Sequence, residues 1–320
     1  MRILYAGYRD RNHSKFAGYD YIARYPGASY LDAGTLPLGC IPVGRCGKRL
    51  NLMVLDYFAR QERDNFDIIH YFYGDSCLFR QKPRKSRARF VSTIHLKAEA
   101  LPARRVGILR SYDGVVALSK AEAARLRDLD IRASFIPHGF PTPQFTGRIY
   151  DGFDIDAVNI FYSGMNYRDF ETFYRMAGYC LGKKLPVRFY AVGQSLENRE
   201  RLMKLGNVVV CPWLDDDAYY SLLSQCDYNF LPLTFATANN ALLEAQALGV
   251  VSIIPEISGI TDYAERNWNL FYSSFDEATS IFDGLSKSAP DGRLIAFSRS
   301  FLWENVYPQL GTFYEDLLGT

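Results

Sequence analysis

Residues 227–265 read DYNFLPLTFATANNALLEAQALGVVSIIPEISGITDYAE, and this stretch decides the fold. An apolar run over 228–233 is followed by a polar patch, by apolar residues at helical spacing over 241–248, and by Gly249. Glycine ends helices well because it adopts a left-handed conformation without strain. The pattern therefore predicts a strand, a loop, a helix with a glycine cap, and a second strand.

The polar patch predicts an anion-binding helix start. Thr237, Asn239 and Asn240 precede the predicted helix, where side-chain oxygens can cap free backbone N–H groups. The positive end of the helix dipole attracts a phosphate there, and Ala241 lies in the same turn. Glu244 follows one turn later, within reach of a ribose hydroxyl of a nucleotide whose diphosphate lies at the helix start. A solvated helix carboxylate is the competing interpretation of Glu244.

The same alternation of apolar runs and helical patterns extends along the whole chain. Strands alternating with helices predict parallel sheets with ligand sites at their carboxyl edges. Residues 30–47, rich in glycine and proline, are expected to be irregular. Further strands are expected at residues 2–8, 66–73, 90–95, 113–118, 158–164, 187–193, 208–211 and 269–272, and a short one near 135.

Length and element order together predict an α/β protein with two doubly wound, Rossmann-like parallel-sheet domains that face a central cleft. A chain of 320 residues is long for a single core. We expect a first domain over residues 1–148, a second, nucleotide-binding domain over residues 149–300, and a closing helix over residues 301–320.

Composition excludes several classes of protein. The apolar fraction is 48% and the charged fraction 22%, as in ordinary folded proteins. No apolar run approaches about 18 residues, so no transmembrane helix is expected, and the N-terminus does not resemble a signal peptide. The six cysteines contain no CxxC pair, which favours a reduced, cytoplasmic protein.

Charge is distributed unevenly between the two halves. Residues 1–150 carry 25 Lys and Arg against 13 Asp and Glu, a net +12, whereas residues 151–320 carry 12 against 22, a net −10. The densest basic run includes Lys82, Arg84, Lys85 and Arg87. Anionic lipid headgroups, an acidic or pyrophosphate-linked acceptor, and nucleic acid could each use it, as could a solvated surface. We expect no nucleic-acid partner.

Three consecutive acids, Asp215 to Asp217, directly precede a helical pattern. A metal-binding DxD motif is one interpretation. An acidic first turn that complements the helix dipole is the better one, because the acids stand at the helix start. We therefore expect no metal and no cofactor.

Several segments resemble the sequence signatures of GT-B glycosyltransferases, in particular the large retaining family four, or glycosyl transferases group 1. These segments are residues 113–119 (DGVVALS), residues 136–139 (IPHG), Glu244 with Ala245 and Gly249, residues 258–259, and Phe301 with Trp303. Two positions depart from the family pattern. Ala236 stands where the family has its first glutamate, and Met165 stands where it has an arginine that holds the donor phosphates.

The resemblance implies roles for four further residues. His95 ends a strand of the first domain, where the family's histidine lies beside the site of sugar transfer. Gly164 and Arg168 follow the first strand of the second domain, where the family binds the donor phosphates. Gly18 is the glycine available in the first loop, which in the family approaches the diphosphate.

The resemblance implies a GT-B fold, in which the N-terminal domain binds the acceptor, the C-terminal domain binds the nucleotide sugar, and the closing helix crosses back to the N-terminal domain. It also implies a metal-independent, retaining hexosyltransferase. The donor would be a nucleoside diphosphate sugar of unspecified base, and the acceptor a glycan or lipid-linked glycan of a cell-surface polysaccharide or glycolipid. A cytoplasmic enzyme of this kind would associate peripherally with the inner, anionic face of a membrane. The alternatives are a catalytically impaired binding protein on the same fold, or a relative that hydrolyses or epimerises nucleotide sugars.

Overall fold

A computed structural model of the chain describes residues 1–9, 18–36 and 44–319 and divides into two compact units. Unit 1 comprises the described residues up to Pro141 together with Phe301 onward, and unit 2 runs from Thr142 to Ser300. Unit 2 thus begins before the expected residue 149. The reason is local, because the backbone N and Oγ1 of Thr146 donate hydrogen bonds to the Asp217 carboxylate of unit 2, at 2.6 and 2.9 Å.

Unit 1 contains a six-stranded parallel sheet among its described residues, in the order β2-β1-β3-β4-β5-β6. Parallel strands place their carboxyl ends at one edge, so the loops after β3, β4 and β5 share that edge. The strands are β1 (Ile3–Gly7), β2 (Ser29–Asp32), β3 (Ile68–Tyr71), β4 (Arg89–Ile94), β5 (Gly114–Ala117) and β6 (Ala133–Phe135).

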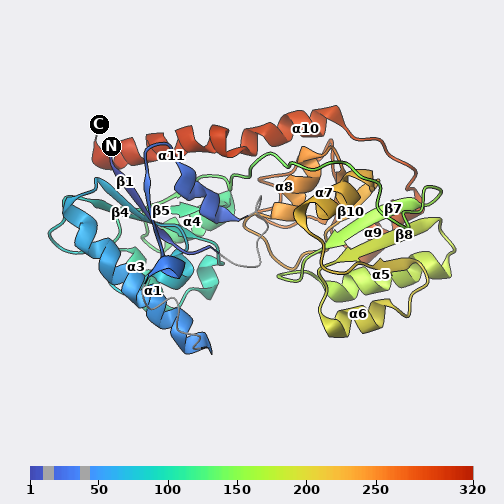
Figure 1. Cartoon of the computed structure of the whole chain (residues 1–320), viewed down its shortest axis with the longest axis horizontal. Coiled ribbons are helices and arrows are strands. Elements are labelled where there is room, and N and C mark those ends of the chain that lie inside the picture. The colour runs from blue at the N-terminus through green and yellow to red at the C-terminus, as the bar shows by residue number, and fades with distance from the viewer. Residues whose placement is uncertain (10–17, 37–43, 320) are drawn as a thin grey trace. The chain divides into compact units, whose positions relative to one another are not determined.

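Helices flank this sheet, and the last helix of the chain belongs to it (Figure 1). The Oη of Tyr314 in that helix lies 2.9 Å from Tyr5 Oη and 2.6 Å from His70 Nδ1, which fixes the helix to β1 and β3. The helices of unit 1 are α1 (Gly44–Gln61), α2 (Gly74–Cys77), α3 (Ala103–Leu109), α4 (Lys120–Asp128) and α11 (Trp303–Leu318), with 3-10 turns at η1 (Tyr19–Arg24) and η3 (Glu62–Asp64).

Two local predictions for unit 1 need correction. Most of strand β2 (Ser29–Asp32) and the start of α1 at Gly44 fall within residues 30–47, the stretch expected to be irregular. At the start of α4, the spacing of Ser119 and Glu122 predicts a capping box. Ser119 Oγ accepts the expected hydrogen bond from Glu122 N at 3.1 Å. The Glu122 carboxylate, however, accepts from Ala98 N at 2.7 Å, so it serves a neighbouring turn rather than completing a capping box.

Unit 2 repeats the architecture with a second six-stranded parallel sheet among the described residues, in the order β12-β11-β10-β7-β8-β9. The order places β7 beside β10, so the loops that follow these two strands are neighbours at the carboxyl edge. The strands are β7 (Val158–Ser163), β8 (Val187–Val192), β9 (Val208–Val210), β10 (Tyr228–Phe230), β11 (Val251–Pro255) and β12 (Leu270–Tyr272).

Both faces of the second sheet are covered by helices (Figure 1). One apolar core joins the sheet to α5 and α9, around the buried Phe173 and Phe282, and a second core joins its other face to α7 and α8. None of the helices within the described ranges is both long and apolar enough to span a bilayer. The helices are α5 (Phe170–Gly182), α6 (Leu196–Leu202), α7 (Asp216–Gln225), α8 (Asn240–Ala247), α9 (Phe275–Asp283) and α10 (Gly292–Ser298).

Candidate functional site

The loops after β7 and β10 are tied together at the carboxyl edge of the second sheet. Thr234 N donates to Tyr167 O at 2.9 Å, and Arg168 forms an antiparallel bridge with Leu233. Gly164, the first residue after β7, has a φ of 82°, a left-handed conformation that glycine adopts without strain. The sequence-predicted residues on these two loops therefore come together in one place.

Arg168 lies folded over the end of β7. Its Nε donates to Ser163 O at 2.8 Å and its Nη1 to Asn166 O at 3.3 Å. A Cβ on Gly164 would stand 3.2 Å from Nη2, so glycine leaves room for the guanidinium. Within the part of the chain that the structure describes, Nη2 makes no hydrogen bond. Burial lowers the pKa of Arg168, partly offset by acidic neighbours that include Glu244, and the group stays cationic at neutral pH.

Glu244 is a buried carboxylate, 7% exposed, so its interpretation as a solvated helix residue is wrong. Tyr219 Oη donates to its Oε2 at 3.0 Å and Tyr220 Oη to its Oε1 at 3.3 Å. Tyr219 Oη also lies 3.1 Å from Ser163 Oγ, which links Glu244 to the end of β7. Burial raises the pKa of Glu244 to about 7, although the two tyrosine hydrogen bonds act in the opposite direction.

The start of α8 follows the polar patch, as predicted. Asn239 is the N-cap, and its Oδ1 accepts from Leu242 N at 3.2 Å. Asn240 and Ala241 form the first turn, and Thr237 is buried just before it. The remaining free N–H groups of that turn give this end of the helix its positive potential.

Gly259 holds the loop in front of α8 in place. It has a φ of 95°, and a Cβ on it would stand 2.0 Å from Ala236 O and 3.3 Å from Thr237 Cα. Only glycine allows so close an approach. Ala236 itself is buried, so the position of the family's missing first glutamate is packed against this turn.

Unit 1 carries His95 at the carboxyl edge of its own sheet, directly after β4. Asp75 Oδ2 lies 3.2 Å from His95 Nδ1, and it accepts from His95 N at 2.8 Å. The Tyr19 and Tyr73 rings lie 5.0 and 4.9 Å from the imidazole. Gly18 precedes Tyr19 and has a φ of 109°, so both sequence-predicted residues of this edge are near neighbours.

Known proteins can now be compared with this geometry. Residues 157–287, within unit 2, match the family model described as Glycosyl transferases group 1. HepE from Anabaena matches with 15% identity and a TM-score of 0.69, over 99% of this chain and 100% of HepE. The chain has the GT-B fold. No curated protein sequence matches it.

Other GT-B structures resemble the chain equally well in fold. Sucrose-phosphate synthase from Thermosynechococcus elongatus gives 18% identity and a TM-score of 0.69, over 99% of this chain and 89% of the synthase. The N-terminal domain of trehalose-6-phosphate phosphatase from Candida albicans gives 12% identity and a TM-score of 0.72, over 99% and 97%. Such low identities establish the fold and leave the activity to be argued from the site.

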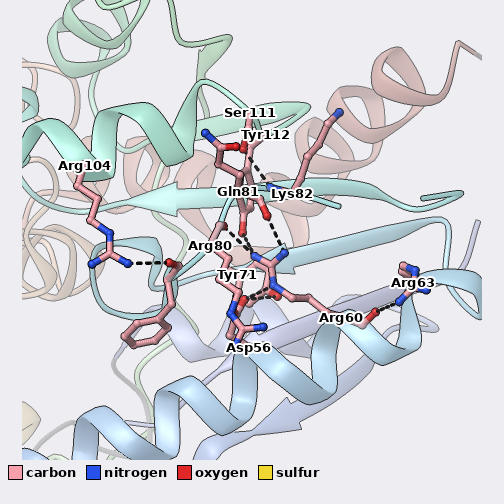
Figure 2. Close-up of polar contacts among 11 residues, drawn as sticks. Asp56, Arg60, Arg63, Tyr71, Arg80, Gln81, Lys82, Arg104, Ser111 and Tyr112 are labelled. Atoms are coloured by element: carbon pink, nitrogen blue, oxygen red, sulfur yellow. Dashed lines mark hydrogen bonds and ion pairs between the residues drawn. The ribbon is translucent and has the colours of Figure 1, made fainter. Parts of the chain in front are cut away.

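The basic run of this GT-B chain is a loop tied to α1 by Arg60 (Figure 2). Arg60 Nη1 donates to Gln81 O at 2.7 Å and Nη2 to Arg80 O at 2.8 Å. Lys82 Nζ lies 2.6 Å from Asp113 Oδ1, so its charge is already paired. Three other predicted cations of the loop, Arg84, Lys85 and Arg87, are exposed, and Arg87 lies 3.8 Å from Asp67.

The acidic triplet of the GT-B chain caps a helix, as predicted. Asp215 Oδ1 accepts from Ala218 N at 2.8 Å at the start of α7. Asp217 is engaged by Thr146 and lies 3.5 Å from Arg148. Among the described residues, no group of three or more His, Cys, Asp or Glu side chains is arranged to hold a metal ion.

Three residues of the two edges escaped the sequence reasoning. Tyr219 and Tyr220 hold Glu244, and Asp75 holds His95. Tyr219 and Tyr220 directly follow the acidic cap of α7, and nothing in their spacing signals a partner on α8. Asp75 stands just after the predicted strand at 66–73, as His95 stands at the end of the predicted strand at 90–95. This shared position at the carboxyl end of a strand is the sequence signal for Asp75.

Proposed function

We propose that the chain is a retaining glycosyltransferase that binds a nucleoside diphosphate sugar at the carboxyl edge of unit 2. The observation that carries the proposal is the unpartnered Arg168 Nη2 beside the start of α8, with the buried Glu244 one turn further on. A guanidinium and a helix N-terminus bind a diphosphate, and a buried carboxylate binds ribose hydroxyls.

The reaction requires electrostatic stabilisation above all. The bond between the sugar's anomeric carbon and the diphosphate oxygen breaks, the acceptor oxygen bonds to that carbon, and the acceptor proton is released. Negative charge builds up on the departing diphosphate, so Arg168 and the α8 N-terminus stabilise it best in the transition state. In unit 1, Asp75 Oδ2 lies 3.2 Å from His95 Nδ1, and His95 is the residue to which the resemblance assigns a role in sugar transfer.

We propose that the enzyme needs no metal ion. The support comes from the acids that could otherwise form a DxD site, because Asp215 caps α7 and Asp217 holds Thr146. Leaving-group charge would then be balanced by Arg168 and the helix dipole.

We assign the acceptor to unit 1 and propose a glycan or a lipid-linked glycan. The support is the net +12 of residues 1–150 and the exposed cations Arg84 and Lys85. A lipid-linked acceptor would bring a cytoplasmic enzyme to the anionic inner face of a membrane, where each exposed Lys or Arg contributes about 1 kcal/mol of attraction.

A panel of hydrolysis and transfer assays tests the proposal. UDP-, GDP- and ADP-sugars should be incubated with and without lipid extract, and UDP is the first choice because HepE has been solved with UDP and with UDP-glucose. We expect turnover of at least one donor, stimulated by the extract. Binding of a nucleotide without any turnover would favour a catalytically impaired binding protein.

That second candidate has specific support. Ala236 replaces the family's first glutamate, and Met165, which replaces a phosphate-binding arginine, is exposed. The fold also occurs in the N-terminal domain of a protein named as a phosphatase. Release of free sugar without transfer would instead favour a hydrolase.

A further inference from the structure

Helix α1 exposes an apolar stripe that no other part of the described structure covers. Leu50, Met53 and Tyr57 recur at i, i+3 and i+7 and are 47%, 42% and 50% exposed. Phe58 is exposed beside Tyr57, with the ring centroids 5.6 Å apart. A surface helix normally turns its one apolar stripe to the core, and α1 already does so through other residues, among them Leu55. The outward stripe is therefore a second apolar face.

The outer face of this helix carries no negative charge among its described side chains. Asp56 is the acid within α1, and it is buried. Its Oδ1 accepts from Arg60 Nε at 2.7 Å and from Tyr71 Oη at 3.0 Å. Arg49, at the near end of the stripe, is exposed. The exposed surface of α1 itself is therefore apolar and cationic, and the acids Glu62 and Asp64 follow only in the turn after the helix.

Arg60 fixes the basic loop against the same helix. Its guanidinium is bound to Asp56 on one side and to the carbonyls of Arg80 and Gln81 on the other, as Figure 2 shows. Arg84 and Lys85 follow in this loop, are exposed, and have no partner among the described residues. The helix that carries the stripe is thus hydrogen-bonded to the start of the loop that carries the two cations.

We propose that α1 and the 80–87 loop form one docking surface for an anionic phospholipid bilayer. Leu50, Met53 and Tyr57 enter the boundary between headgroups and acyl chains, while Arg84 and Lys85 meet lipid phosphates. Charge complementarity selects this partner. A symmetric dimer through the same face would bury cations of both copies in one interface, where the described side chains of α1 include no exposed acid to pair with them. The inference extends the proposed function, because it names the surface that a lipid-linked acceptor would require.

Vesicle flotation with three variants tests the proposal. The stripe variant carries Leu50→Ser, Met53→Ser and Tyr57→Ser, and the charge variant carries Arg84→Ser and Lys85→Ser. Leu196→Ser with Met203→Ser is the matched control, because these side chains on and beside α6 are 71% and 66% exposed. Vesicles contain phosphatidylglycerol with phosphatidylcholine, or phosphatidylcholine alone.

Wild type and the control should float with the anionic vesicles and remain free with neutral ones. The stripe variant should lose at least about tenfold in partitioning at every salt concentration, a change of about 1.4 kcal/mol. The charge variant should be released at lower salt than wild type, because only its electrostatic attraction is weakened. Flotation of the stripe variant equal to that of wild type would overturn the proposal.

A Tyr57→Trp variant reports insertion through the difference between its emission and that of wild type, which contains three tryptophans. The difference spectrum should shift to the blue with anionic vesicles and be quenched by brominated lipids, whereas an unchanged difference spectrum would contradict insertion. A different result would overturn the proposal: wild type is dimeric and does not bind vesicles, while the stripe variant is monomeric. The face would then be a self-association surface.

UDP calorimetry on the same samples separates the two proposals. Unchanged UDP affinity in the stripe variant shows that unit 2 is intact and supports a loss confined to membrane docking. The opposite result is also informative. If wild type floats, the stripe variant does not, and wild type binds no UDP, the docking surface is supported and the proposed donor site is overturned.

Discussion

The carboxyl edges of the two sheets share one architecture and differ in chemistry. The edge of unit 2 gathers a cation, a capped helix start and a buried acid, in Arg168, Asn239 and Glu244. The edge of unit 1 gathers aromatic rings around a histidine and a carboxylate, His95 and Asp75. Every nucleoside diphosphate sugar carries the same diphosphate group and so requires similar binding residues, whereas acceptors differ in their chemistry. The family match lies within unit 2.

The largest expected effect comes from removing the cation of the unit 2 edge. Arg168→Ala should lower the rate of transfer by about 10²–10³, because one preformed donor to the leaving diphosphate is lost. Arg175→Ala is the control, since it removes the same charge from an exposed position on α5. Steady-state rates with a saturating donor measure both. Equal rates for the two variants would remove Arg168 from the mechanism.

Glu244→Gln should mainly weaken donor binding, by about 1–3 kcal/mol, because a charge-assisted hydrogen bond to ribose becomes a neutral one. Calorimetry with UDP at pH 8, above the pKa of about 7, measures the ionised carboxylate. UMP, which keeps the ribose, and free phosphate, which lacks it, serve as controls. Unchanged UDP affinity would exclude Glu244 from the site.

The edge of unit 1 should respond in the catalytic rate rather than in donor binding. Asp75→Asn should lower kcat about tenfold, on the scale that support of a positioned residue typically contributes. The same change in a His95→Ala background should have almost no further effect, because Asp75 acts through His95. Additive losses in this double-mutant cycle would make Asp75 a structural residue only.

Glu244 should also make stability depend on pH. The folded state binds its proton more tightly than the unfolded state, so the free energy of unfolding falls as pH rises from about 4.5 to about 7. Glu244→Gln should remove that fall, and its stability relative to wild type should rise by about 1–3 kcal/mol between pH 5 and pH 8. Urea unfolding of both proteins at the two pH values checks this. An equal change in the free energy of unfolding for wild type and variant would contradict the claim that Glu244 is buried and ionises in this range.

The smallest expected effect is that of chelation. Activity should survive EDTA, because Asp215 and Asp217 are engaged at the start of α7. Turnover lost on chelation and restored by Mn²⁺ would show that these acids bind metal after all.

Sequence reasoning predicted the sheets because buried parallel strands appear as short apolar runs, as at 158–163 and 251–255. It also predicted the caps at Ser119 and Asn239, because capping is a local interaction. Strand β2 was missed because it is an edge strand whose residues are largely exposed, so it has no apolar run.

Site residues that directly follow strands could be predicted from the sequence. Contacts between side chains of two different helices could not. Gly164 and Arg168 were placed by their position after β7. The contact of Tyr219 with Glu244 joins α7 to α8 and follows only from their packing. The burial of Glu244, and hence its raised pKa, depends on the same packing.

A structure of the chain with UDP tests the central claim most directly. The diphosphate should lie at the first turn of α8, within hydrogen-bond distance of Arg168 Nη2, and the ribose hydroxyls should lie at Glu244. A diphosphate bound away from Arg168 and α8, or at the Asp75 and His95 edge of unit 1, would contradict the assignment of the donor to unit 2.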